Sequence, residues 1–351
     1  MVWEMAPLRD VSVTAAPPVV LRGHSAAVNC VRWSRDGKLL ASAGDDTIIM
    51  IWEGSGSNNY SSKCTLMAHT DPVVHLDWHL DDCQLASCSA DHTVMTWRVR
   101  PSASFTPTFK FVGHSDVVYG CCWVSDTTLV SQSSDRTLRL WQIGTKEAVK
   151  ISEAPFSTAT TPQVFQRPDV SPDRSLLLAV HARSGSAPVV LAVNTTTLQP
   201  VDDFVGFRAP ATVCRFLRNQ VETPDHSMAM CWACGTNDRS LTLWFSDSAR
   251  PLFAIEEFFG NSVTDISLKA ADDGMEVLAT SADGSARYIS LNVSELKGRR
   301  LIPLTPSQQV SESASVTSTS GTATTQQTEE TVITAEGRSR RRITPQFLPQ
   351  Q

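Results

Sequence analysis

The sequence lacks any hydrophobic run near the ~20 residues that a membrane-spanning helix needs, and no signal peptide opens it. Positive charge is in the minority, because 30 lysines and arginines face 36 aspartates and glutamates, a net charge of −6 over 351 residues. This balance argues against a nucleic-acid-binding surface spread over the whole protein. The nine cysteines are odd in number and irregularly spaced, which argues against a secreted disulfide framework. We expect a soluble protein of a reducing compartment.

Motifs of common enzymes are also missing: there is no glycine-rich phosphate loop, no Walker motif and no metalloprotease helix. What the sequence contains instead is a repeat of about 45 residues. In three segments a histidine is followed by a serine, an aspartate and a closing tryptophan, with the serine ten and the aspartate six residues before the tryptophan. These twelve residues are His24, Ser42, Asp46, Trp52, His69, Ser87, Asp91, Trp97, His114, Ser131, Asp135 and Trp141.

Runs such as Val28–Trp33, Leu39–Ala43 and Thr47–Trp52 have the length and alternation of strands and are bounded by turn residues. The pattern resembles the WD-repeat family, in which each repeat supplies four strands to a propeller blade. The resemblance implies that the four side chains of one blade form a hydrogen-bonded network, in which the aspartate accepts from the histidine ring. Histidine, serine and aspartate also make up hydrolase triads, but a set that appears three times at a fixed period indicates architecture. We therefore expect no enzyme, and no cofactor or metal.

Later repeats are more degenerate. Asp238 and Trp244 are kept, while Phe207 stands where the histidine belongs; segments 170–180 and 260–289 also have the features of blades. Six blades are thus recognisable in an all-β WD40 propeller spanning residues 1–300. Met1–Glu4 matches the repeat endings, so we expect it to be the end of a further N-terminal blade, with seven blades in all. The alternative is six blades that close with an irregular seam.

The tail has a different composition. From Pro306 to Ala335, 14 of 30 residues are serine or threonine, which predicts a disordered linker over residues 301–336. Residues 337–351 then predict a short linear motif, with four arginines in five residues ahead of Ile343. Three interpretations compete: a nuclear-localisation or weak nucleic-acid patch, a solvated charge run without function, and a peptide that adds as a strand to a sheet edge.

The propeller is similar to the HIRA (Hir) family of histone chaperone subunits. This resemblance rests on five stretches and on a tail segment that looks like the family's B-domain motif. The stretches are 28–34, 44–52, 203–206, 238–244 and 265–267, and the tail segment is Arg340–Pro345. The order of propeller, flexible linker and basic motif is also that of the family.

The resemblance implies a scaffold for replication-independent nucleosome assembly and for the regulation and repression of transcription, acting on chromatin in the nucleus. Its tail would bind the anti-silencing-function histone chaperone by strand addition, with Ile343 in an apolar pocket and the arginines against acidic residues. Core histones would be bound indirectly, and other HIRA-complex subunits through the propeller, with no membrane or small-molecule substrate involved. The implied contact residues are Arg340, Arg341, Arg342, Ile343, Thr344, Pro345 and Leu348. Gln346 departs from the family, which usually has an aliphatic residue there, and so puts the affinity in doubt.

Two other classes remain open. The propeller subunit of chromatin assembly factor one also combines a propeller with a similar tail motif, but the segments 238–244 and 262–267 agree better with HIRA. A ubiquitin-ligase substrate receptor is poorly supported, because the residues after the closing tryptophans do not have the Trp-Asp-x-Arg pattern.

Two weaker patterns in the sequence resemble metal or redox sites. Cys231 and Cys234 have the C-x-x-C spacing of zinc and redox sites but lack two further ligands. We expect them to be small buried hydrophobes on an inner strand. His75, Asp77 and His79 would share one strand face; a hydrogen-bonded face is a better interpretation than a metal site.

Overall fold

The computed structural model describes residues 19–54, 59–100, 106–144, 148–151, 156, 165–197, 199–302 and 340–342. In this part of the chain every regular element is a β-strand, and no helix is long and apolar enough to cross a membrane. The expected partial blade at Met1–Glu4, most of the linker, and the motif residues from Ile343 onward lie outside the described residues.

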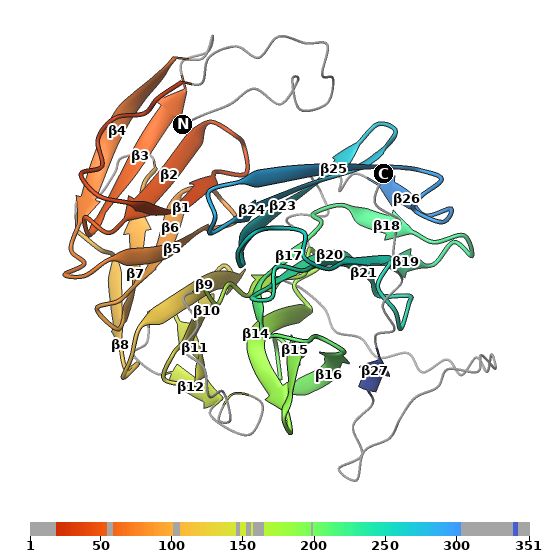
Figure 1. Ribbon diagram of the computed structural model, residues 1–351. Helices are drawn as coiled ribbons and strands as arrows, with labels where there is room; N and C mark the ends of the chain where they lie inside the picture. The colour runs from red at the N-terminus through yellow and green to blue at the C-terminus, as the bar shows by residue number, and fades with distance from the viewer. Residues whose placement is uncertain are drawn as a thin grey trace.

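Six sheets follow one another along the chain, and Figure 1 shows them arranged in a ring; we call them blades 1 to 6. Blade 1 consists of β1 (Val28–Trp33), β2 (Leu39–Gly44), β3 (Ile48–Gly54) and β4 (Tyr60–Met67). Blade 2 consists of β5 (Val73–Trp78), β6 (Gln84–Ser89), β7 (Thr93–Arg98) and β8 (Phe109–Val112). Blade 3 consists of β9 (Val118–Ser125), β10 (Thr128–Ser133), β11 (Leu138–Gln142) and β12 (Ala148–Ile151).

The other three blades are less regular. Blade 4 consists of β13 (Asp169–Val170), β14 (Leu176–Ser184), β15 (Ala187–Asn194) and β16 (Pro200–Val205). Blade 5 consists of β17 (Ala211–Phe216), β20 (Cys231–Thr236), β21 (Leu241–Phe245) and β22 (Phe253–Ile255). Blade 6 has three strands, β23 (Val263–Ala271), β24 (Gly274–Ser281) and β25 (Ala286–Asn292). The predicted all-β WD-type propeller with six recognisable blades is confirmed.

A small additional sheet and one short strand complete the structure. The small sheet pairs β18 (Gln220–Glu222) with β19 (Met228–Ala229) and β26 (Arg300–Ile302), so regular structure continues two residues beyond the expected domain boundary at 300. The short strand, β27 (Arg340–Arg342), is added to the outer edge of blade 4.

The hydrophobic core is divided into layers between blades, because strand side chains alternate and each sheet buries both faces. Five clusters each join two consecutive blades. Between blades 1 and 2, for example, Leu39 and Ile51 of blade 1 pack in one cluster with Leu76 and Trp97 of blade 2. Burial of these apolar layers is the main force that holds the blades side by side.

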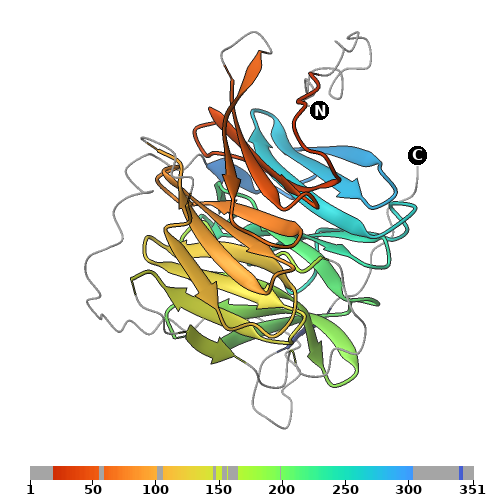
Figure 2. The ribbon, with the colours of Figure 1, turned by 90° about the vertical axis from the view of Figure 1, so that its left-hand side faces the viewer.

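The layer between blade 6 and blade 1 differs from the other five. Blade 6 lies beside blade 1 in both views of the ribbon (Figures 1 and 2). Among the described residues, however, no cluster joins the two; Leu40, Met50 and Trp52 pack only with neighbours preceding or within blade 1. We call this interface the seam.

Equivalent residues of the first strands show how open the seam is. On β1, Val28, Val31 and Trp33 are 46%, 51% and 45% exposed. The matching residues of β5 are almost fully buried, at 0%, 0% and 3%; they are Val73, Leu76 and Trp78. The same sequence pattern is therefore covered in blade 2 and uncovered in blade 1.

Candidate partner-binding site

The repeated polar residues form the same hydrogen-bonded network in blades 1, 2 and 3. In blade 2, Trp97 Nε1 donates to Ser87 Oγ at 2.8 Å, Ser87 Oγ lies 2.8 Å from His69 Nε2, and His69 Nδ1 lies 2.8 Å from Asp91. A histidine that carries its proton on Nδ1 satisfies every donor in this series. In blades 1 and 3 the distances are 2.7 to 2.9 Å, with residues His24, Ser42, Asp46, Trp52, His114, Ser131, Asp135 and Trp141.

The aspartates of these networks are held ionised. Burial opposes ionisation of Asp91, but hydrogen bonds from His69 and Thr93 outweigh it and bring its pKa below the ordinary value. Burial of Asp135 is outweighed in the same way by His114 and Thr137, so its pKa is also lowered. These hydrogen bonds use the polar groups of the four side chains inside each blade.

Blade 5 departs from this network because Phe207 replaces the histidine and cannot donate. Trp244 Nε1 donates instead to Thr242 Oγ1 at 3.0 Å, and the Phe207 ring packs against the Trp244 ring with centroids 6.1 Å apart. Asp238 accepts a hydrogen bond from Thr236 and does not contact the tryptophan through a shared serine. The sequence predicted that Asp238 and Trp244 belong to such a network, but in the structure their hydrogen-bond partners differ from those in blades 1 to 3.

The basic tail segment is a strand on the propeller edge. The backbone of Arg340–Arg342 pairs in parallel with β16, with Arg340 opposite Asp203 and Arg342 opposite Val205. Two acidic residues, Asp202 and Asp203, lie within this edge strand. The sequence predicted strand addition to a partner's sheet, and the pairing with the protein's own blade 4 had no signal in the repeat pattern.

His75 lies among cationic side chains rather than at a metal site. Its Nε2 accepts from Arg32 at 3.0 Å and from Arg215 at 3.2 Å. Burial and these guanidinium groups hold its pKa well below the ordinary value, so the ring is neutral. His75, Cys88 and Cys121 bring their ligand atoms within 4.8 Å of one another. The guanidinium groups of Arg32 and Arg215 beside the ring, together with the buried thiols, disfavour a cation there.

The neighbouring residues of that strand face have separate partners. Asp77 accepts a hydrogen bond from the Trp123 backbone N–H at 2.8 Å, and His79 Nδ1 lies 2.6 Å from Asp81. The expectation of a hydrogen-bonded face therefore fits the contacts.

The C-x-x-C cysteines are fully buried. They lie on β20, the second strand of blade 5, and not on its innermost strand, which is β17. Cys234 Sγ lies 3.0 Å from Cys214 Sγ across the strand pair, while Cys231 Sγ lies 4.0 Å from Met275 Sδ. The two thiols of the motif thus point to different neighbours and do not converge on one ligand.

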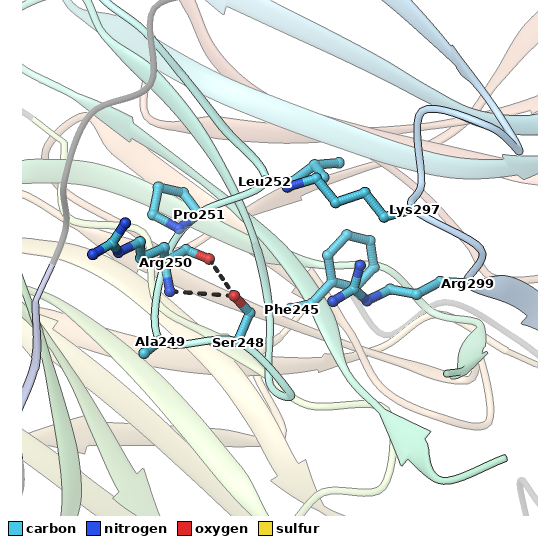
Figure 3. A pocket seen from close by; sticks show the side chains of 8 residues that line it. All are labelled: Phe245, Ser248, Ala249, Arg250, Pro251, Leu252, Lys297 and Arg299. Atoms are coloured by element: carbon cyan, nitrogen blue, oxygen red, sulfur yellow. Dashed lines mark hydrogen bonds between the residues drawn. The ribbon is translucent and has the colours of Figure 1, made fainter. Parts of the chain in front are cut away.

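A surface pocket of about 300 Å³ lies between the β21–β22 connection of blade 5 and the segment that leads from β25 to β26 (Figure 3). Phe245 lies within it, with the Arg299 guanidinium 4.6 Å from the ring centroid, and Arg299 also pairs with Asp247 at 2.9 Å. Ser248 Oγ donates to the Arg250 carbonyl at 2.9 Å. Among its described lining residues there is no histidine or carboxylate that would activate this serine.

Comparison with known proteins agrees with the geometry. The family described as "WD domain, G-beta repeat" matches residues 16–53, 60–98 and 105–142. Protein HIRA of Xenopus laevis is 30% identical over 330 residues, covering 84% of this chain and 32% of that protein. Protein HIRA of Homo sapiens is also 30% identical with the same coverage. Protein hir1 of Schizosaccharomyces pombe is 26% identical over 284 residues, covering 75% of this chain and 29% of that protein.

Among solved structures, the one titled "Structure of U3-55K" matches with a TM-score of 0.60 and 19% identity, over 82% of this chain and 83% of that one. At this identity the likeness concerns the fold alone. The ring of blades, the repeated network and the matched repeats define a WD-repeat propeller protein. Within that class the chain belongs to the HIRA family, and it spans about a third of the length of the curated relatives it matches.

Proposed function

We propose that the protein is a non-enzymatic subunit of a HIRA-type histone chaperone complex, acting in the nucleus in replication-independent nucleosome assembly and transcriptional regulation. The match to HIRA proteins over 84% of the chain supports this assignment. The polar networks of blades 1 to 3 connect the strands within each blade, which is the role expected in a scaffold protein. The propeller would bind other subunits of the complex.

The tail is the proposed contact with the anti-silencing-function histone chaperone, through residues 340–348. The observation that carries this proposal is the pairing of Arg340–Arg342 with β16, since it indicates a segment suited to strand addition at a sheet edge. Ile343 would fill an apolar pocket of the partner, and Arg340 and Arg342 would bind its carboxylates. Pairing would fade at Pro345, which has no N–H to donate.

The proposed mechanism is tethering. A linker rich in serine and threonine lets the tail capture the chaperone with its core histones while the propeller stays bound to the complex. Holding both on one chain raises the effective concentration of histones near the propeller without any new contact.

Calorimetric titration of the full chain into the organism's own anti-silencing chaperone tests this proposal. We expect saturable binding, lost in the double variant Ile343→Ala/Arg340→Ala. The matched control Val332→Ala/Arg338→Ala removes one apolar and one basic side chain from the same tail outside the proposed contact, and should bind as the unaltered chain does.

Two results would overturn the assignment. If no binding is found up to about 1 mM, the free energy of binding is weaker than roughly −4 kcal/mol and the tail is not a docking motif. If the double variant binds as tightly as its control, Ile343 and Arg340 do not form the contact.

A further inference from the structure

The first strands of the blades face one another around the centre of the ring, and charged side chains meet there. Arg32 and Arg167 contact Asp265 Oδ2 at 2.5 and 2.6 Å, and Arg215 contacts Asp265 Oδ1 at 3.2 Å. These residues come from blades 1, 4, 5 and 6. Three guanidinium groups thus share one carboxylate, and neutral His75, which accepts from two of them, adds no negative charge.

A second set of arginines lies at the ends of the same strands: Arg35 after β1, Arg174 after β13 and Arg218 after β17. Because the first strands run alongside one another around the ring, these three residues lie at one end of the centre. We call them the end arginines. Arg218 pairs with Asp169 at 2.8 Å, while the Arg174 guanidinium donates, among the described residues, to the backbone carbonyls of Trp123 and Val124.

Arg35 is exposed to solvent and, among the described residues, has fewer side-chain partners than the other two end arginines. Its guanidinium makes no hydrogen bond or ion pair with the described residues, although its backbone N–H donates to Asp82. Burial and the neighbouring Arg35 and Arg218 lower the pKa of Arg174 to about 10, which indicates that the end arginines repel one another. The Asp77 carboxylate attracts all three end arginines, but its hydrogen bond comes from the Trp123 backbone N–H.

The centre of the ring therefore has an excess of positive charge. Six arginines face four aspartates, Asp77, Asp82, Asp169 and Asp265, in a chain whose overall net charge is −6. Like charges held close in a partly buried site raise its energy, and an anion placed among them lowers it. Arg218 remains 46% exposed, so the site is open to solvent at this end.

We propose that the end arginines bind an acidic peptide segment of a partner protein. Carboxylate side chains match the guanidinium fork and accept two parallel hydrogen bonds from it. A long, uniform polyanion such as nucleic acid fits less well, because Asp36 and Asp173 lie in the same turns as Arg35 and Arg174 and would repel it.

Fluorescence anisotropy with a dye-labelled hexaglutamate peptide and the full chain at low salt tests the proposal. We expect saturable binding that weakens about tenfold or more in the variant Arg35→Ala/Arg174→Ala. Arg35→Ala alone removes a side chain with no described hydrogen bond, so it should weaken binding without changing the thermal unfolding midpoint. The control Arg208→Ala removes an exposed arginine paired with Glu256 in a turn of blade 5, and its affinity should equal that of the unaltered chain.

Equal affinity of the double variant and the Arg208→Ala control would overturn the proposal, as would failure of hexaglutamate to bind up to about 1 mM. A single-stranded DNA oligonucleotide provides the competing probe. If it binds more tightly than hexaglutamate and is lost in the same variants, the site takes nucleic acid and the assignment to an acidic peptide is wrong. The basic tail also attracts hexaglutamate, so only the binding that is lost in Arg35→Ala/Arg174→Ala and kept in Arg208→Ala reports on the end arginines.

Discussion

The indole N–H of Trp78 donates to the backbone carbonyl of Arg32 at 2.9 Å, tying the first strand of blade 2 to the first strand of blade 1. Trp33 holds the same place in blade 1 and faces the seam, where it is 45% exposed. Five of the six interfaces between neighbouring blades are therefore apolar layers, whereas the sixth, the seam, is open.

The exposure of Trp33 leads to a fluorescence prediction. Acrylamide should quench part of the tryptophan emission of the folded chain, because Trp78, Trp97 and Trp141 are buried while Trp33 is not. The variant Trp33→Phe should lose most of that quenchable part. If Trp33→Phe and Trp97→Phe remove equal quenchable fractions, the seam is covered in solution.

The serine at the centre of each network should contribute more to the free energy of unfolding than its small side chain suggests. Ser87→Ala removes the oxygen that accepts from Trp97 and contacts His69, leaving a buried indole donor without a partner. We expect a loss of about 1–3 kcal/mol in the free energy of unfolding, measured by urea denaturation. Ser62→Ala on the exposed face of β4 is the control and should change stability by less than about 0.5 kcal/mol. A Ser87→Ala protein as stable as the control would contradict the network's role.

The shared carboxylate at the centre should be hard to replace. Asp265→Asn leaves Arg32, Arg167 and Arg215 without the charge that holds them together. Breaking a partly buried ion cluster of this kind costs about 3–5 kcal/mol. Glu257→Gln removes an exposed pair with Arg239 and should cost less than about 1 kcal/mol. Similar unfolding midpoints for the two variants would show that Asp265 does not hold the ring.

Acid should destabilise the propeller through its network aspartates. The pKa values of Asp91 and Asp135 are lowered in the folded state, whereas an aspartate in the unfolded chain has a pKa of about 3.9. Their contribution is complete above about pH 4 and is lost as the pH falls further toward the folded-state pKa values, because the unfolded chain binds protons first. Urea unfolding at pH 6 and pH 3 should show a smaller difference for Asp91→Asn/Asp135→Asn than for the unaltered chain. An unchanged difference would mean that other carboxylates dominate.

The repeats predicted the fold well because each blade is specified locally. A histidine, a serine, an aspartate and a tryptophan at fixed spacing define where one blade's strands lie, and Phe207 marked the blade that departs. The contacts around Asp265 were not predictable in this way, since they join residues up to 233 positions apart and have no repeated pattern. The exposure of β1 could not be predicted from the sequence either. The sequence of β1 matches that of β5, and only the neighbouring blade decides whether such a strand is covered.

The pairing of β27 with β16 also bears on how the protein behaves before it meets a partner. An outermost strand presents unpaired N–H and C=O groups that can recruit other chains into sheets. With Arg340–Arg342 in place, part of this edge on blade 4 is occupied by a paired strand. Pairing with β16 then competes with pairing to a partner's sheet. While the segment stays on β16, fewer of its backbone groups are available to a partner. A partner's apparent affinity for the whole chain would equal its affinity for the free tail multiplied by the fraction of tails that are free.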